Sequence, residues 1–105
     1  MSPVVTPASK AEIEKFLSSH SQWSITDNAL SRHFTFSDFK EAFAFMSAVA
    51  VEADAADHHP EWSNVYNKVS IRLITHDAGP AISQKDFSLA EKIDLLFAQK
   101  NKNPR

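Results

Sequence analysis

The sequence predicts an α+β fold, a two-layer sandwich in which a four-stranded antiparallel sheet carries its helices on one face. Amphipathic helical patterns stand at the beginning, the middle and the end of the chain, and a pair of short strand-like segments lies in each interval between them. The turns inside these pairs are short, as antiparallel hairpins require. The expected order is therefore helix-strand-strand-helix-strand-strand-helix, with the apolar helix stripes buried against the sheet.

Capping and turn residues mark the first helix and the first pair of strands. Ser9 followed by Glu12 fits a capping box at the start of the helix, and Thr6 before a proline is an equally good start. Strands are expected over 23–26 and 30–36, on either side of an Asp-Asn turn. The mostly apolar face of the second strand consists of Leu30, Arg32, Phe34 and Phe36. This alternation is typical of a half-buried strand.

The middle helix has the clearest apolar periodicity in the chain. It begins after Ser37 and Asp38, and Pro60 disfavours helical geometry at His59, so we expect the helix to end there. The stripe expected to face the core comprises Phe39, Ala42, Phe43, Met46, Val49, Ala50 and Ala53. The aromatic residues of this stripe indicate core packing rather than a ligand-binding box.

The second pair of strands is expected at 64–66 and 68–76, and a final helix follows. Ser83 with Asp86 three residues later fits a second capping box, which opens that helix. Its buried stripe is expected at Phe87, Ala90, Ile93 and Phe97. As a helix cap alone, Asp86 should be worth about 0.5–2 kcal/mol of stability, and its removal should change any activity by less than about tenfold.

The composition indicates one domain spanning residues 1–105 and excludes several classes of protein. With 105 residues, 43% of them hydrophobic, the chain is long enough for one core. The net charge of −2 offers no basic surface for nucleic acid, and the absence of cysteine excludes disulfides and thiolate sites. Gly79 is the only glycine, which excludes a glycine-rich phosphate loop. Without a membrane-length apolar run or a signal-peptide pattern, the protein is expected to be cytoplasmic and not bound to membranes.

Three histidines are the candidate catalytic residues of the sequence. His58 and His59 stand together at the expected end of the middle helix, and His76 ends an expected strand. Imidazole titrates near neutrality, so it can both give and take a proton there. His20 and His33 have no partner in this pattern and are expected as surface or core residues.

Two other interpretations of the histidines stay open on the residues alone. A histidine at the C-terminal end of a helix is also favoured by the helix dipole, which would make its role structural. Three imidazoles with Asp54 or Asp57 could instead hold zinc. Adjacent histidines bind one ion awkwardly, however, and no His-x-x-x-His spacing is present.

A longer motif resembles that of the pterin-4a-carbinolamine dehydratases. The residues that carry the resemblance are Asp54, His58, His59, Pro60, Tyr66, His76 and Asp86. The surrounding segments 57–62, 64–69 and 75–77 also look like this family, and the match covers nearly the whole chain. The sequence departs from the pattern at Pro80, where the family usually has a second glycine.

The resemblance implies an activity and a set of site residues. The reaction would be dehydration of 4a-hydroxytetrahydropterin, which aromatic amino acid hydroxylases release, by histidine acid–base catalysis with no cofactor and no metal. His58 and His76 would form the acid–base pair, and His59 would orient the pterin. Residues expected to contact the substrate are Asp57, His58, His59, Thr75, His76 and Asp77. Asp54 stands one helical turn before His58, so it could orient an imidazole, or it could be an exposed helix acid. Trp62 could wall the site or serve in packing.

The resemblance also bears on partners. Small domains of this kind leave apolar sheet and helix surface to cover, and the family suggests a homodimer or homotetramer. Animal members of the family also bind a homeodomain transcription factor as a dimerisation cofactor. The alternative function is therefore a protein-interaction module in which catalysis is secondary.

Overall fold

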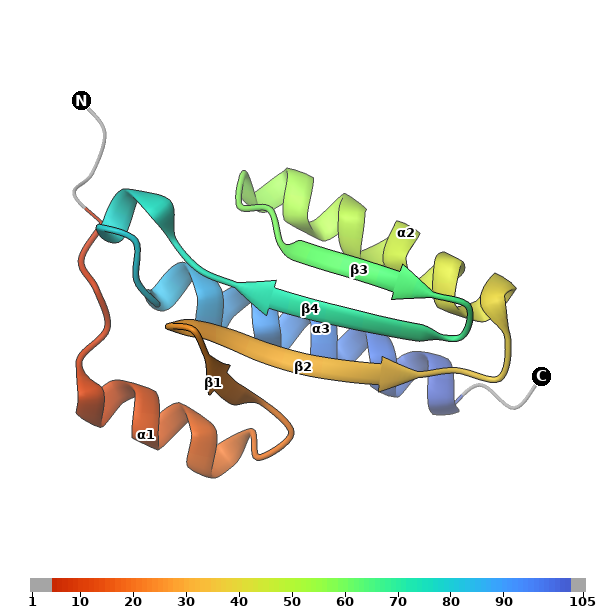
Figure 1. The fold of residues 1–105 in the computed structure, drawn as a ribbon, viewed down its shortest axis with the longest axis horizontal. Coiled ribbons are helices and arrows are strands. Elements are labelled where there is room, and N and C mark those ends of the chain that lie inside the picture. Colours follow the sequence, from red (N-terminus) through yellow and green to blue (C-terminus); the bar gives the residue numbers. More distant parts are fainter. Residues whose placement is uncertain (1–4, 103–105) are drawn as a thin grey trace.

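The computed structural model describes residues 5–102, with the side chains of residues 5–99. The elements are α1 (Lys10–Ser19), β1 (Ser24–Thr26), β2 (Ala29–Thr35), α2 (Phe39–Ala56), β3 (Glu61–Val65), β4 (Lys68–Leu73), the 3₁₀ helix η1 (His76–Ala78) and α3 (Gln84–Lys102) (Figure 1). The predicted α+β class and element order are confirmed, and η1 is an addition. Of the expected domain 1–105, residues 1–4 and 103–105 lie outside the described residues.

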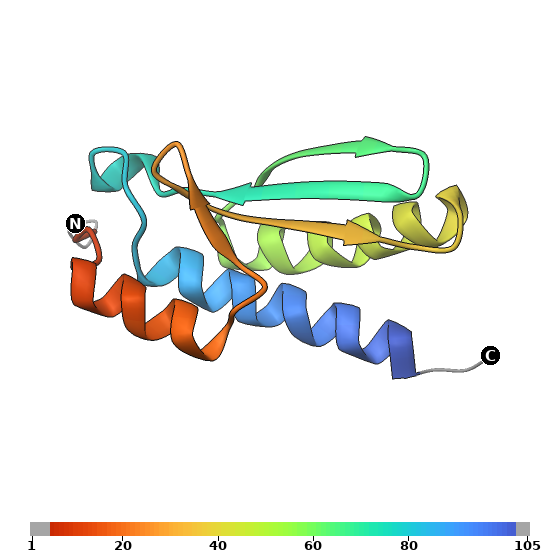
Figure 2. The same cartoon turned by 60° about the horizontal axis from the view of Figure 1, so that its bottom comes forward.

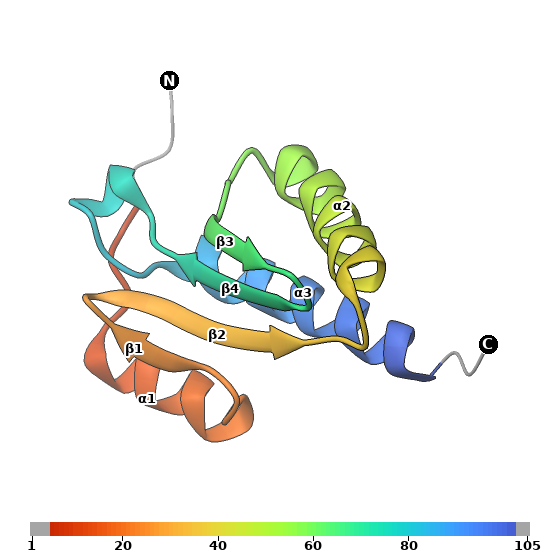
Figure 3. The same cartoon turned by 45° about the vertical axis from the view of Figure 1, so that its right-hand side comes forward.

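The four strands form one antiparallel sheet in the order β1-β2-β4-β3. β2 and β4 lie at its centre, with Leu30 opposite Leu73 and Phe34 opposite Val69. The helices cover one face of the sheet, which leaves the other face open (Figure 2). α1 lies on the side of β1, whereas α2 lies on the side of β3 (Figure 3). This is the predicted two-layer arrangement.

Phenylalanine rings fill the space between the two layers. The ring of Phe45 in α2 lies 5.0 Å from those of Phe34 and Phe36, measured between centroids. Phe97 of α3 packs edge-on against Phe34, also at 5.0 Å. Full burial of one such side chain is worth about 1.5–3 kcal/mol. This aromatic cluster joins α2 and α3 to the central strand.

The apolar stripe predicted for α2 is partly wrong. Ala42, Val49 and Ala53 are buried as expected, but Phe45, which the prediction omits, occupies the centre of the inner face. Phe39 and Phe43 are 48% and 55% exposed, and their rings pack on each other 5.8 Å apart. Met46 is half-buried and Ala50 is exposed.

The cause of this error is that α2 is apolar nearly all round, so its periodicity does not select one face. Within residues 5–102, no helix, α2 included, combines the length and the hydropathy needed to cross a membrane.

The start of α1 agrees with one of the two predicted alternatives. Glu12 donates its N–H to Ser9 Oγ at 3.1 Å, and the N–H of Ser9 donates to Glu12 Oε1 at 2.8 Å. This is the reciprocal capping box, which satisfies backbone groups that a helix start leaves unpaired. The alternative start at Thr6 is wrong.

Candidate active site

The end of α2 positions His58 through its backbone. Asp57 adopts the left-handed conformation, with φ of 51° and ψ of 42°. The N–H of His58 then donates to the carbonyl of Ala53, and the N–H of Asp57 donates to that of Asp54, both at 3.1 Å. These two bonds form a Schellman motif, which usually has glycine in the left-handed position. Because the motif reverses the chain, His58 turns back toward the start of α3.

A loop closed by two backbone hydrogen bonds between Thr75 and Ala81 positions His76. The N–H of Thr75 donates to the carbonyl of Ala81 at 2.9 Å, and the N–H of Ala81 donates back to that of Thr75 at 3.1 Å. The loop between them holds η1, which begins at His76 and ends at Gly79 with φ of 97°. Glycine takes this conformation without steric cost, which accounts for the only glycine in the chain.

The two segments meet in a pocket of about 210 Å³. Its lining comprises Asp57, His58, His59, Ile74, Thr75, His76, Asp77 and Lys85. All six residues expected to contact the substrate therefore lie around one cavity. Ile74 and Lys85 complete the lining and are not among the residues predicted from the sequence.

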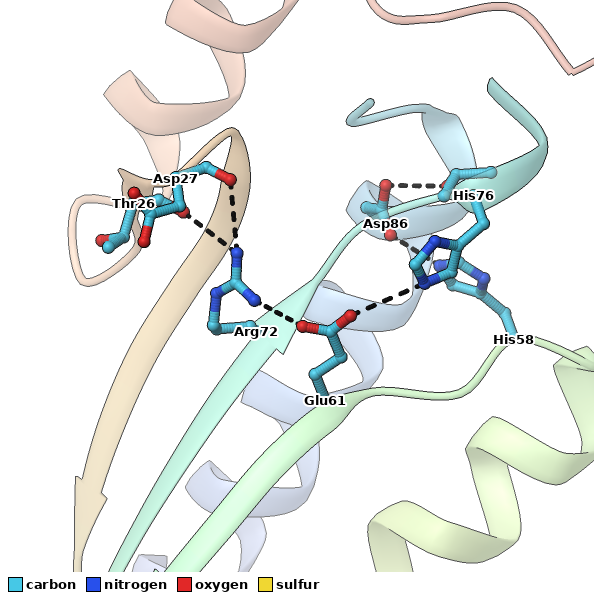
Figure 4. A network of polar contacts seen from close by, with 8 residues as sticks. Thr26, Asp27, His58, Glu61, Arg72, His76 and Asp86 are labelled. Carbon is cyan, nitrogen blue, oxygen red and sulfur yellow. Dashed lines mark hydrogen bonds and ion pairs between the residues drawn. The ribbon is translucent and has the colours of Figure 1, made fainter. Parts of the chain in front are cut away.

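The imidazole of His58 is buried against a carboxylate. Its Nε2 lies 2.6 Å from Oδ1 of Asp86, whose side chain is 0% exposed (Figure 4). Because a carboxylate can only accept, Nε2 of His58 carries the proton and donates it. Nδ1 of His58 makes no hydrogen bond to any described residue, so it is the ring atom available to a ligand.

Asp86 is more than the helix cap that the sequence predicts. Its Oδ2 accepts the N–H of Ser83 at 2.9 Å, as expected for the start of α3, and also the hydroxyl of Thr75 at 2.8 Å. Ser83 accepts the N–H of Lys85 at 3.2 Å, so its hydroxyl caps the second helical residue rather than the third. One buried carboxylate thus joins the helix start, the loop of His76 and the ring of His58.

The side chain of Thr75 is occupied by this network. Its hydroxyl lies 2.6 Å from Oγ of Ser83 and donates to Asp86. The backbone N–H and carbonyl of Thr75 both form hydrogen bonds with Ala81. Thr75 is 2% exposed. Its evident role is therefore to support the pocket wall from inside.

His59 also lines the pocket and contacts Asp54. Its Nε2 is 3.3 Å from Asp54 Oδ1, and both side chains are mostly exposed. The expectation that Asp54 orients an imidazole one helical turn ahead is wrong for His58, because the Schellman motif turns that ring away. Trp62 does not line the pocket; it lies with His59 in a neighbouring groove between α2 and β3.

A second carboxylate, which the sequence analysis missed, stands beside His76. Oε2 of Glu61 lies 3.6 Å from Nε2 of His76, and Oε1 of Glu61 accepts a hydrogen bond from Arg72 (Figure 4). The signal for it was present in the sequence, since Glu61 follows the His58-His59-Pro60 run directly. Each of the two proposed acid–base histidines therefore has its own carboxylate.

Other polar residues of the sequence analysis lie outside the pocket. Tyr66 lies in the β3–β4 turn, at the far end of the hairpin from η1 (Figure 1). His33 pairs with Ser70 on the sheet, and His20 stacks on Phe16. Among the described residues, no three histidine, aspartate or glutamate side chains form a cluster suited to a metal ion.

Comparisons with known proteins identify the family of this chain. Residues 6–96 match the model of the family described as pterin 4 alpha carbinolamine dehydratase. A relative from Solibacter usitatus is 47% identical over 90% of this chain and 99% of its own length. One from Rhodospirillum rubrum is 55% identical over 80% of this chain and 88% of its own. Both carry the name "Putative pterin-4-alpha-carbinolamine dehydratase".

A solved structure shares the fold. The crystal structure of a transcriptional coactivator/pterin dehydratase from Brucella melitensis superimposes with a TM-score of 0.82 at 34% identity. The match covers 87% of this chain and 98% of that one. The family match spans most of the chain, and relatives of nearly the same length support it. This chain therefore belongs to the pterin-4a-carbinolamine dehydratase family.

Proposed function

We propose that this protein dehydrates 4a-hydroxytetrahydropterin to quinonoid dihydropterin and water. The observation that carries the proposal is a single small pocket lined by His58 and His76, each beside a carboxylate. The family membership supports the choice of substrate. The product would be returned to the tetrahydro form by a reductase and would then serve an aromatic amino acid hydroxylase again.

The proposed reaction needs two proton transfers. The C4a–O bond breaks as one imidazolium protonates the departing hydroxyl, which leaves as water. The N5–H proton passes to the other imidazole, and the freed electron pair forms the C4a=N5 bond. Nδ1 of His58 is the reacting atom on its side, because Asp86 holds Nε2. His59 contacts the pterin face and orients it.

The demands of this chemistry match what imidazoles can supply. The nitrogen lone pair assists departure of the hydroxyl, so acid–base catalysis of about 10²–10⁴-fold is sufficient. Asp86 stabilises the imidazolium that His58 becomes when it takes a proton. Proton exchange with solvent then resets both rings.

The test is a dehydration assay on freshly prepared 4a-hydroxytetrahydropterin, with and without exhaustive chelation. We expect turnover in both conditions. His58→Ala and His76→Ala should each lower kcat by about 10²–10⁴-fold, and the double variant should lose far less than the product of the two. Loss of activity on chelation that zinc restores would favour the zinc site instead. Wild-type turnover by His76→Ala would contradict the paired mechanism.

Protein stability must be measured beside turnover. His76 is 73% exposed, so His76→Ala should leave the melting temperature unchanged. His58→Ala removes one of the three hydrogen-bond donors of the buried Asp86, and stability should fall by about 1.5–3 kcal/mol. Its turnover is therefore expressed per folded molecule.

A protein-interaction role is the second candidate, and exposed aromatic surface on α2 favours it. Phe39 and Phe43 are both exposed on this helix, and their rings lie in contact at a tilted angle. The Brucella melitensis relative is named a coactivator as well as a dehydratase. Two variants distinguish these functions. The His58→Ala/His76→Ala variant should lose turnover and keep partner binding, whereas Phe43→Lys should keep turnover and lose partner binding.

A further inference from the structure

Glu61 is held in place from two directions. It is the first residue of β3, and the strand register sets it opposite Arg72 of β4. Arg72 donates from Nη1 to Glu61 Oε1, and its Nη2 points to the carbonyls of Asp27 at 3.3 Å and Thr26 at 3.5 Å. Because guanidinium is planar, its contact with the β1–β2 turn fixes the side that faces Glu61 (Figure 4).

His76, by contrast, is held loosely by the rest of the protein. Its side chain is 73% exposed, and it makes no hydrogen bond to any other described residue. An exposed imidazole exchanges between rotamers on the picosecond to nanosecond timescale. The one charged group that the described residues place beside its ring is Oε2 of Glu61, 3.6 Å from Nε2.

We infer that Glu61 is the positioning residue of His76 and that Arg72 holds it for this purpose. The carboxylate attracts the Nε2–H of His76, which leaves Nδ1 as the atom that exchanges a proton with the substrate. At 3.6 Å the contact is longer than a hydrogen bond, and such contacts commonly shorten when a substrate binds. The inference rests on the proposed function and extends it.

The two histidines are then supported in different ways. Asp86 is fully buried, whereas the side chain of Glu61 is 45% exposed. Water and salt weaken an exposed pair, so Glu61 should contribute much less than Asp86 and should do so mainly at low ionic strength. The chain also contains a matched contact outside the pocket: Glu91 lies 3.5 Å from Nε2 of His20.

The experiment compares Glu61→Gln with Glu91→Gln. Glutamine keeps the size of the side chain and can still accept from Arg72, but it carries no negative charge. We expect Glu61→Gln to lower kcat about two- to fivefold at low salt, with KM nearly unchanged and the difference shrinking at high salt. Glu91→Gln should behave as wild type. In a His76→Ala background, Glu61→Gln should cause no further loss.

A spectroscopic measurement tests the contact without relying on activity. Nitrogen-15 shifts of the His76 ring report which nitrogen carries the proton, and Glu61→Gln should lower the fraction protonated on Nε2. An unchanged fraction, or an equal loss of kcat in the His76→Ala background, would overturn the inference. Absence of dehydration by the wild-type protein would instead overturn the proposed function, while the ring shifts would still decide whether Glu61 orients His76.

Discussion

At the scale of single residues, Asp86 joins stability to the proposed catalysis. Its carboxylate accepts hydrogen bonds from a backbone amide, a hydroxyl and an imidazole while fully buried. A buried carboxylate without such donors is costly, because it has lost its hydration. The same bonds that satisfy Asp86 therefore fix the ring of His58 and the tautomer it presents.

Asp86→Asn should consequently impair both properties. The amide group cannot accept on its nitrogen, so at least one of the three donors loses its partner. We expect kcat to fall about 10²–10⁴-fold per folded molecule. Denaturant titration should show a loss of about 2–5 kcal/mol, between a lost charge-assisted hydrogen bond and a broken buried pair.

The control for this variant is Ser9→Ala, which removes the cap of α1, a helix that contributes no residue to the lining of the pocket. It should cost about 1 kcal/mol and leave turnover intact. If Asp86→Asn resembled this control in both measurements, the cap-only interpretation drawn from the sequence would be right after all.

At the scale of secondary structure elements, the Schellman motif at the end of α2 decides where His58 points. Asp57 occupies its left-handed position, which costs a non-glycine residue about 1–2 kcal/mol. Asp57→Gly should keep the geometry and change stability by less than about 1 kcal/mol, because the relief of strain offsets the added freedom of the unfolded chain. Asp57→Val should lose about 1–2 kcal/mol.

Thermal unfolding measures the stability of the two Asp57 variants, and steady-state kinetics measures their KM and kcat. A rise in KM for Asp57→Gly at constant kcat would assign the carboxylate a contact with the substrate. Instability of the glycine variant equal to that of the valine variant would contradict the backbone argument.

The secondary structure elements also show which features of the fold could be predicted from the sequence and which could not. The capping box of Ser9 and Glu12 depends only on residues close together in the sequence, so it could be predicted together with the helix that it begins. The inner face of α2 could not be predicted from the sequence, because nearly every face of that helix is apolar. Only the packing of Phe45 against Phe34 and Phe36 determines which face is buried. His58 and Asp86 stand 28 positions apart, and the helix start already explains Asp86 locally. No local pattern therefore pointed to their contact.

At the scale of the whole molecule, the exposed surface of α2 predicts self-association. Phe43 is 55% exposed and Val51 is 68% exposed, on a helix whose inner face is already filled. Burial of such side chains in an interface is worth about 25 cal/mol per Å² before the costs of association. We expect a homodimer or homotetramer at micromolar concentration.

Light scattering checks this prediction. The wild-type mass should be a multiple of 11.7 kDa, and Phe43→Lys should shift it toward the monomer without lowering the melting temperature of the folded chain. Leu95, which is 62% exposed on α3, provides a control in Leu95→Lys. A monomer in the wild type, or equal dissociation by both variants, would contradict assembly through α2.

The central β2–β4 ladder also governs how the chain folds in time. His33 of β2 pairs with Ser70 of β4 across 37 positions, whereas the hairpins β1–β2 and β3–β4 each close over a two-residue turn. Closing a long loop costs more entropy than closing a short one, so the hairpins and α2 can form before the ladder joins them. The pocket draws on the segments directly before β3 and directly after β4, and on the start of α3, which is the last of these to be synthesised. Its geometry is thus completed late, and a chain interrupted before α3 is synthesised has no buried carboxylate for His58.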